Sequence, residues 1–381
     1  MDTTSRLVSL AVPAGVHMES QSGIQALDPR IYGRLAEPAR RGDRRLAFVV
    51  MHPTSNFFNH YLLEPLAARG AAVLALNSRY VANDTMLLME RVIQDLGAGI
   101  RLLRAEGWEQ VVLIGNSGGG ALAALYQQQA ERLTIQDTPD GRPIDLRAEQ
   151  LPPADALALL CAHPGRAHTL AEWLDPSVTD EHDVLSRDPD LDLYAEGRAV
   201  PLEARWLAGY RDAQRARHRR ITTRVLERLR QLDALPGAQA PRDEAFVIHR
   251  TMADPRFVDM TLDPSDRVPG TVWGPPQAVN HAPNNIARFS TLRSYLSQWS
   301  WDHTRARGPD CLHDTTVPVL NVQYTADQIV FPSHFRLWSD AASGRCTEHH
   351  LRGINHYPQG RPEAVTELAD LLMDWSAAVR R

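Results

Sequence analysis

The sequence predicts an α/β fold, in which a mostly parallel, doubly wound sheet carries an inserted, mainly helical cap. Short apolar runs recur along the chain, and each ends in a polar, turn-like cluster. Stretches with a helical spacing of apolar residues lie between these runs, and such alternation is typical of a parallel sheet with crossover connections. Between about residues 166 and 309 the alternation stops, and the composition becomes charged and rich in proline.

Five apolar runs are the predicted strands of the sheet. Each run is continuous instead of alternating with polar residues, which fits parallel strands that are buried on both faces. In chain order the runs are residues 46–51, 71–76, 111–114, 156–161 and 317–322. A shorter run at 348–351 is a further candidate strand.

Three helices are predicted in the core. Residues 86–104 place their apolar side chains mostly three and four positions apart, which gives one apolar face. Residues 121–133 are rich in small side chains and directly follow a group of glycines. The last helix begins near Pro362, a residue type that suits the first turn of a helix.

The segment without apolar runs contains one long predicted helix, over residues 202–235. Its apolar side consists of Ile221, Val225, Leu229 and Leu232. Arginines elsewhere on the helix are diluted by acidic residues, so we expect a solvated face there and not an anion-binding one. We expect residues 1–165 and 312–381 to form the core and residues 166–311 to form the cap.

The composition excludes several chemistries and partners. All 41 basic residues of this 381-residue chain are arginines, so a PLP Schiff base, a lysine nucleophile and a phosphate-loop lysine are excluded. A net charge of -5 argues against nucleic acid or a membrane surface as partner, and no apolar run reaches bilayer-spanning length. Three widely spaced cysteines and no leader pattern in the first 30 residues predict a cytoplasmic location.

The strongest local signal is Gly115-Asn116-Ser117-Gly118-Gly119, which joins a predicted strand to a predicted helix. A serine on so sharp a turn has a strained backbone and closely packed neighbours, so glycine is needed two positions to either side. The turn would place the Gly118 N–H where it can stabilise an oxyanion. An ordinary glycine-rich turn is the alternative, but the strand–turn–helix setting favours a nucleophile at Ser117.

With this motif in this setting, the chain resembles the α/β-hydrolase superfamily over about residues 44–165 and 312–381. The resemblance implies a mostly parallel sheet, a nucleophilic serine at the turn, an acid after a later strand and a histidine near the C-terminus. It does not extend to the cap or to the N-terminal stretch. Each partner of Ser117 must therefore be identified in this chain.

The resemblance assigns the base to His356 and the acid to Asp327. His356 ends the segment 353–356 and stands just before the last helix, where the family places its catalytic histidine. It would accept the Ser117 proton and then return it to the leaving group. Asp327 follows the strand at 317–322 and precedes His356 by 29 positions (356 − 327), a separation usual in the family. Its role would be to orient and stabilise the imidazole.

Other candidates for these roles are weaker. His349 and His350 lie inside a predicted strand, where side chains point into packing. Asp175, beyond the strand at 156–161, is the fallback acid that some relatives use. We expect His52 to be a structural loop residue and not a second base.

The second oxyanion donor is expected in the loop after the strand at 46–51. The family commonly has His-Gly there, whereas this chain has His52-Pro53-Thr54. Pro53 has no N–H and cannot donate. The backbone N–H of Thr54 is therefore the predicted partner of the Gly118 N–H.

Substrate contacts are expected from four residues near the end of the cap: Trp273, Asn284, Trp299 and Trp301. Core packing explains the tryptophans equally well, because large aromatic side chains dominate burial anywhere. The histidines are scattered without metal-ligand spacing, so we expect no metal site, and the resemblance implies no cofactor. A homodimer formed through an apolar cap surface stays open.

These assignments make a serine hydrolase the leading hypothesis. Its substrate would be a carboxylic ester of a small or medium apolar acid or alcohol, cleaved through an acyl-enzyme. A carbon–carbon bond hydrolase of the ring-fission type and an acyltransferase keep the same triad and are alternatives. A ligand receptor on the same fold is the non-enzyme alternative, although it would not need all three triad residues.

Overall fold

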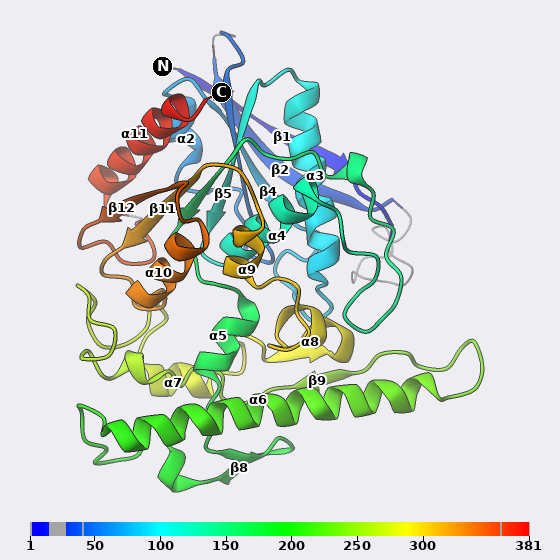
Figure 1. The fold of residues 1–381 in the computed structure, drawn as a ribbon, viewed down its shortest axis with the longest axis vertical. Coiled ribbons are helices and arrows are strands. Elements are labelled where there is room, and N and C mark those ends of the chain that lie inside the picture. The colour runs from blue at the N-terminus through cyan, green and yellow to red at the C-terminus, as the bar shows by residue number, and fades with distance from the viewer. Residues whose placement is uncertain (1, 15–27, 40–41, 359, 381) are drawn as a thin grey trace.

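The computed structural model describes residues 2–14, 28–39, 42–358 and 360–380. Its centre is an eight-stranded sheet in the order β1-β2-β4-β3-β5-β6-β11-β12 (Figure 1). Neighbouring strands from β4 to β12 pair in parallel, whereas β1 and β2 extend the sheet in antiparallel fashion, which confirms the mostly parallel sheet. The strands are β1 (Thr3–Ala11), β2 (Arg30–Pro38), β3 (Leu46–His52), β4 (Ala72–Asn77), β5 (Gln110–Asn116), β6 (Ala156–Leu160), β11 (Val319–Tyr324) and β12 (Cys346–Leu351).

The first two strands are not predicted by the sequence. β1 is the edge strand, and most of its side chains are exposed, with Val8 buried. A strand with so little burial has no continuous apolar run to reveal it. Residues 15–27 belong to the N-terminal stretch in which no leader pattern is recognised, and they lie outside the described residues.

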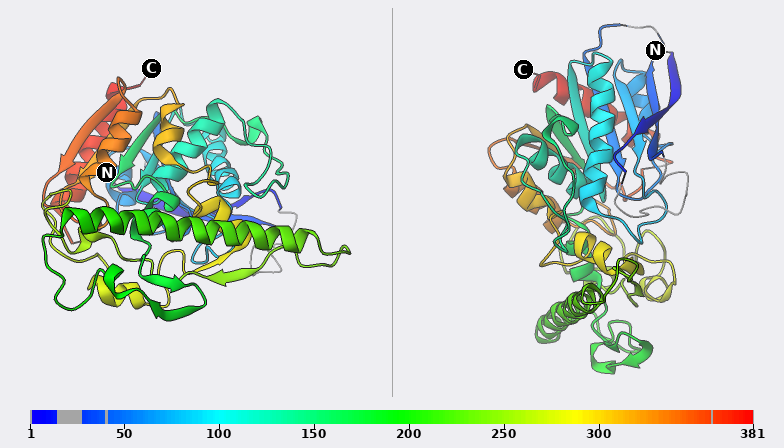
Figure 2. Two further views of the ribbon diagram at one scale, coloured as in Figure 1. Left: turned by 60° about the horizontal axis from the view of Figure 1, so that its bottom comes forward. Right: turned by 90° about the vertical axis from the view of Figure 1, so that its right-hand side faces the viewer.

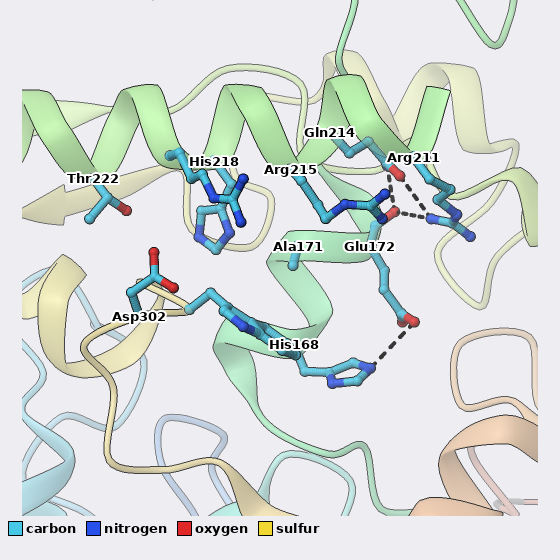
Figure 3. A pocket seen from close by; sticks show the side chains of 11 residues that line it. His168, Ala171, Glu172, Arg211, Gln214, Arg215, His218, Thr222 and Asp302 are labelled. Carbon is cyan, nitrogen blue, oxygen red and sulfur yellow. Dashed lines mark hydrogen bonds and ion pairs between the residues drawn. The ribbon is translucent and has the colours of Figure 1, made fainter. Parts of the chain in front are cut away.

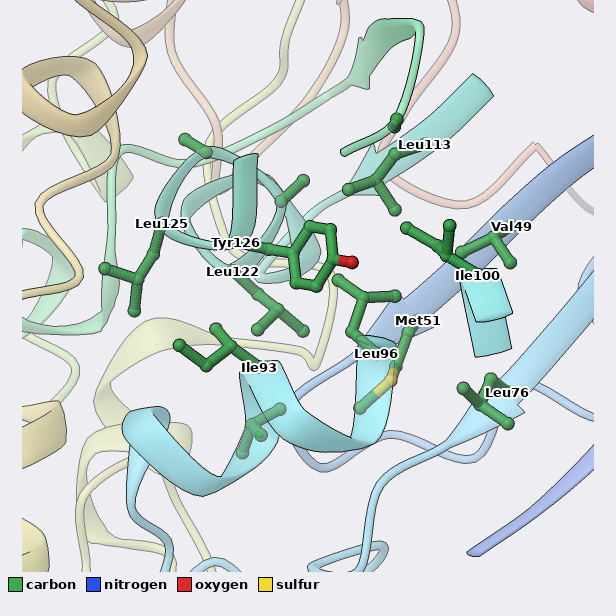
Figure 4. Close-up of a cluster of buried hydrophobic side chains, with 14 of the residues drawn as sticks. Val49, Met51, Leu76, Ile93, Leu96, Ile100, Leu113, Leu122, Leu125 and Tyr126 are labelled. Carbon is green, nitrogen blue, oxygen red and sulfur yellow. The ribbon is translucent and has the colours of Figure 1, made fainter. Parts of the chain in front are cut away.

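Helices cover both faces of the sheet, as a doubly wound fold requires. Val49 and Met51 of β3 pack with α3 and α4 on one face, in the buried cluster of Figure 4. Phe48 and Val50 point to the opposite face and pack with α2 and α11, because successive side chains of a strand alternate in direction. The core helices are α2 (Leu63–Ala67), α3 (Met89–Ala105), α4 (Gly119–Glu131), α10 (Pro332–Ala341) and α11 (Pro362–Ala378), with a 3-10 turn η1 (Ala148–Gln150).

The segment between β6 and β11 gathers at one end of the molecule, opposite the two chain termini (Figures 1 and 2). It contains the expected helices. It also contains short strands, which the sequence does not predict. Its helices are α5 (Arg166–Trp173), α6 (Ala204–Asp233), α7 (Pro276–His281), α8 (Leu292–Gln298) and α9 (Gly308–His313), with 3-10 turns η2 (Pro189–Leu191) and η3 (Pro255–Phe257). Its strands are β7 (Val178–Asp180), β8 (Asp183–Arg187), β9 (Ala245–Val247) and β10 (Phe289–Thr291), in two two-stranded sheets.

The long helix α6 buries the apolar side that the sequence predicts. Ile221, Val225, Leu229 and Leu232 pack in one cluster with side chains of α5 and α8. The segment also contacts the loops that follow the sheet strands. After β4, the Met89 N–H donates to Ser297 Oγ at 2.8 Å, and after β11, the Asp266 N–H donates to the Thr325 carbonyl at 2.9 Å. The segment therefore lies at the carboxyl edge of the sheet.

The expected boundary at residue 312 falls within α9, and α9 packs against α4 of the core. A search of the described residues for a helix both long and apolar enough to cross a bilayer finds none.

Candidate active site

Ser117, Asp327 and His356 meet at the carboxyl edge of the sheet. The Nε2 atom of His356 lies 2.9 Å from Ser117 Oγ, and its Nδ1 atom lies 2.6 Å from Asp327 Oδ2. Ser117 follows β5, Asp327 follows β11 and His356 follows β12. These strands run in parallel, so residues 239 positions apart along the chain come within hydrogen-bond distance. The structure therefore brings together the three side chains singled out in the sequence.

Ser117 stands on a strained turn between β5 and α4. Its φ angle is 55°, in the left-handed region that residues other than glycine rarely adopt. Its neighbours leave no room for side chains: a Cβ atom on Gly115 would lie 2.8 Å from Gly120 Cα, and one on Gly119 would lie 2.5 Å from the Met51 carbonyl oxygen. The Ser117 N–H donates to the Leu160 carbonyl of β6 at 3.0 Å. The glycine pattern thus has the steric reason expected of it.

Asp327 is held by backbone donors from its own loop. Its Oδ1 atom accepts the N–H groups of Ile329 and Val330 at 2.8 and 2.9 Å, while Oδ2 faces His356. The side chain is 1% exposed. The two backbone bonds leave one carboxylate oxygen for the imidazole and determine which oxygen it is.

Asn355 joins the loops that carry the acid and the base, and the sequence analysis does not single it out. Its Oδ1 atom accepts the His356 N–H at 2.7 Å and the Gln328 N–H at 3.2 Å. Its Nδ2 atom donates to Gln328 Oε1 at 2.8 Å. An amide can accept and donate at once, so a single side chain cross-links both loops. Its place directly before His356 is the one signal in the sequence that points to it.

The pKa of His356 reflects two opposing influences. Burial is the largest single influence and lowers the pKa, but the charge and hydrogen bond of Asp327, with smaller contributions from Cys161, together raise the pKa of His356 well above its ordinary value of 6.5. A carboxylate at hydrogen-bond distance favours the imidazolium form, which a general base becomes when it accepts a proton.

The backbone N–H groups of Gly118 and Thr54, the two predicted oxyanion donors, differ in whether they already have an acceptor. Gly118 is the N-cap residue of α4, and its N–H has no acceptor among the described residues. The Thr54 N–H instead donates to Nδ1 of His52 at 3.1 Å. Thr54 is therefore not free to donate to an oxyanion in this structure, because its only backbone donor is occupied within its own loop. The role predicted for Thr54 therefore stays a prediction, and it would require this hydrogen bond to His52 to break.

The fallback candidates lie elsewhere. Asp175 is fully buried in an ion pair with Arg250, 2.6 Å between Oδ2 and Nε, and also accepts from Asn280. His349 bonds to Glu367, and His350 bonds to Gln323 of the neighbouring strand β11. Neither histidine contacts Ser117.

The four candidate substrate residues are not brought together. Trp299 is 2% exposed and belongs to the apolar cluster between α6 and α8. Of the two roles that the sequence left open for this tryptophan, core packing and pocket lining, it therefore has the first. Trp273 and Asn284 are exposed. Trp301 lines a cavity of about 420 Å³ between α5 and α6 (Figure 3). The other side chains of that cavity include polar ones such as His168, and its lining residues do not include Ser117, Asp327 or His356.

Two groups of described residues bring possible metal ligands within 4.8 Å of one another: Cys161, Asp327 and His356, and His168, Glu172 and His334. The first group shares its acid and base with the site above. In the second, Glu172 accepts from Arg256 at 2.5 Å and from His334 Nε2 at 2.8 Å. The Phe331 N–H donates to His334 Nδ1 at 3.3 Å, which leaves the proton on Nε2. Because this nitrogen offers a proton and not a lone pair, the second group is an ion-pair network.

No protein-family model matches the chain, and no curated protein matches it in sequence. The structure is similar to that of DcsB in complex with its substrate analogue, with 12% identity over 99% of each chain and a TM-score of 0.53. It is also similar to an esterase domain of a Rhodothermus marinus protein, with 13% identity over 98% of each chain and a TM-score of 0.47. A proline iminopeptidase of Mycobacterium smegmatis shares 17% identity over 98% of this chain and 100% of its own, with a TM-score of 0.44.

The strand order and the similarity to DcsB show that this chain has the fold of the α/β-hydrolase superfamily. The resemblance inferred from the elbow motif at Ser117 is confirmed at the level of the fold.

Proposed function

We propose that this protein is a serine hydrolase that cleaves a carboxylic ester of a small or medium apolar substrate through an acyl-enzyme. One observation carries the proposal: Ser117 Oγ lies 2.9 Å from His356 Nε2, and His356 Nδ1 lies 2.6 Å from Asp327. A hydroxyl, an imidazole and a buried carboxylate in this order form a nucleophile, a base and the group that orients the base.

The proposed reaction has two stages. In the first, Ser117 Oγ attacks the ester carbonyl while its proton passes to His356 Nε2. The tetrahedral intermediate collapses, the bond to the alcohol oxygen breaks, and His356 returns the proton to that oxygen. In the second, water attacks the acyl-serine while its proton passes to His356 Nε2. The second tetrahedral intermediate collapses, the acid leaves, and His356 returns the proton to Ser117 Oγ.

The strained turn at Ser117 supports this role. A left-handed backbone at a non-glycine residue costs about 1–3 kcal/mol, so it persists only where surrounding packing enforces it, and such residues cluster at active sites. The same turn starts α4 and leaves the Gly118 N–H without an acceptor among the described residues. A free N–H beside a nucleophile can stabilise the negative oxygen of the intermediate.

The experiment combines active-site labelling with turnover. We expect a fluorophosphonate probe to label the wild-type protein and p-nitrophenyl esters of short to medium chain length to be hydrolysed. The Ser117→Ala variant should lose both, whereas Ser343→Ala, at an exposed serine after α10, serves as the matched control and should retain both. Labelling that survives Ser117→Ala would contradict the proposal.

The identity of the bond is tested separately. A ring-fission dienoate and an acyl acceptor other than water are assayed beside the esters. Turnover of the dienoate alone, or product formed only with the acceptor, would replace ester hydrolysis with one of these reactions while leaving Ser117 as the nucleophile.

A further inference from the structure

The loop after β3 directs the side chain of His52 toward the site, and its hydrogen bonds define the tautomer. The backbone N–H groups of Thr54 and Ser55 both donate to His52 Nδ1, at 3.1 and 2.8 Å. A nitrogen that accepts two hydrogen bonds carries no proton, so the proton of the neutral ring is on Nε2. His52 therefore presents an N–H donor on the side of the ring that faces away from its own loop.

That donor lies over the residue after the nucleophile. A Cβ atom on Gly118 would be 2.5 Å from His52 Nε2, so the imidazole occupies the space that any side chain at position 118 would need. Within the described parts of the chain, His52 Nε2 makes no hydrogen bond. Two free donors, the Gly118 N–H and the His52 Nε2–H, thus stand beside each other at the start of α4.

The loop is held so that Thr54 does not replace His52. The Pro53 carbonyl accepts the Ser78 hydroxyl at 2.5 Å, and the Thr54 carbonyl accepts the Ala82 N–H at 2.8 Å. Turning the Thr54 N–H toward the site would break its bond to His52 and disturb these contacts. The segment after β4 therefore keeps the Thr54 N–H on the imidazole.

The charge of His52 fits a donor and not a base. Burial, and to a smaller extent the positive charges of Arg166, His163 and His356, lower the pKa of His52 well below its ordinary value of 6.5. The ring is neutral at neutral pH, so it can polarise an oxygen through a hydrogen bond without holding a charge before the reaction.

We propose that the Nε2–H of His52 is the second oxyanion donor of this enzyme and acts together with the Gly118 N–H, so that a side chain performs what the family assigns to a loop N–H. The inference rests on the proposed hydrolysis at Ser117. As Ser117 Oγ attacks, the carbonyl oxygen becomes an oxyanion that accepts both hydrogen bonds, and both are kept until the carbonyl re-forms. No proton is transferred from His52.

His163 is the competing side chain. Its Nε2 atom would lie 3.1 Å from the same Cβ position on Gly118, but its buried Nδ1 atom has no partner, so nothing determines its tautomer. A His163→Asn variant is therefore included in the test.

The test uses two substitutions at position 52 that separate the two nitrogens. In His52→Asn, Oδ1 takes the place of Nδ1 and keeps accepting from the loop, but no donor reaches the Nε2 position. In His52→Gln, the amide nitrogen reaches the Nε2 position, but the loop loses its acceptor. The readouts are kcat and KM with a p-nitrophenyl ester, the Ki of a boronic acid that forms a tetrahedral adduct, and the Tm.

For His52→Asn we expect kcat to fall by about 100- to 1,000-fold, as for loss of one oxyanion donor, with KM and Tm little changed. The Ki of the boronic acid should rise in parallel with the loss of kcat/KM. His52→Gln should retain more kcat than His52→Asn although its Tm is lower.

Two results would overturn the assignment. One is a kcat that falls in proportion to Tm in His52→Asn and His52→Gln, as expected if His52 only stabilises its loop. The other is a loss of kcat in His163→Asn but in neither variant of His52. These outcomes differ from failure of the proposed function. A wild-type protein that hydrolyses no ester, or a Ser117→Ala variant that still does, would remove the hydrolase itself. Normal turnover that depends on Ser117 but not on His52 would remove only this inference.

Discussion

Replacing Asp327 by asparagine should abolish the proposed hydrolysis without unfolding the protein. Asp327 Oδ1 accepts two backbone N–H groups, from Ile329 and Val330, so the oxygen of the new amide must stay in that position. The NH2 group then occupies the place of Oδ2 and faces His356 Nδ1, 2.6 Å away in the wild type. Two donors cannot face each other, so the imidazole proton moves to Nε2.

The consequence for Ser117 can be given a magnitude. His356 Nε2 accepts the Ser117 proton only through its lone pair, and in the variant that nitrogen already carries a proton. The same substitution in a serine protease triad lowers kcat by about 10,000-fold, which corresponds to about 5.4 kcal/mol of transition-state stabilisation. We expect a loss of this order, with KM changed much less.

The assay is kcat and KM for a p-nitrophenyl ester across a pH series, with Tm as the control for folding. The variant should also show a lower His356 pKa by NMR, because the negative charge that raises it is gone. A variant that keeps kcat within about tenfold of the wild type would refute the triad, since wrong-tautomer inactivation is far larger.

Three further predictions follow from the same geometry. The kcat/KM of the wild type should fall as pH decreases, with a midpoint above 6.5, because a base with a raised pKa is protonated below that pKa. The stability that His356 gains from its carboxylate partner should be present below pH 6.5 and be lost as pH rises through the raised pKa. Urea unfolding at several pH values checks this second expectation. Gly119→Ala should destabilise the fold by about 1–3 kcal/mol, since its Cβ would meet the Met51 carbonyl at 2.5 Å, whereas Gly209→Ala, with nothing within 4 Å, should not lower the Tm. Equal Tm changes in the two glycine variants would contradict the close packing at the elbow. Asn355→Ala should lower the free energy of unfolding by about 1–3 kcal/mol, because the loops that carry Asp327 and His356 lose their cross-link. It should also lower kcat by a larger factor than it changes KM. An unchanged kcat would show that the two loops need no such link.

Five strands of the parallel sheet, β3, β4, β5, β6 and β11, were predictable because burial on both faces leaves continuous apolar runs in the sequence, whereas β12 buries only Leu351. The two small sheets of the segment 166–311 and the β1–β2 pair leave no such signal. β8, for example, alternates between exposed and partly buried residues, and β9 spans only Ala245–Val247. Exposed or very short strands depend on their partner for stability, and the partner is not visible in the local sequence.

The tryptophans of the segment 166–311 illustrate the same limit at the level of side chains. A tryptophan in the sequence is equally consistent with core packing and with a pocket wall, and the structure distinguishes Trp299, which is buried in a cluster, from Trp301, which lines a cavity. Packing partners from α6 and α8 decide the difference, and they come from positions far along the chain.

By itself, the sequence determined the strand–turn–helix at Ser117, because the steric demands of a sharp turn leave a local pattern of glycines, whereas Asp327 and His356 were assigned through the resemblance to a family. Tertiary structure alone decided which N–H groups beside Ser117 stay free. That outcome depends on Ser78 and Ala82 holding the loop after β3, and on an imidazole filling the space above a glycine, and no local pattern encodes contacts between segments so far apart.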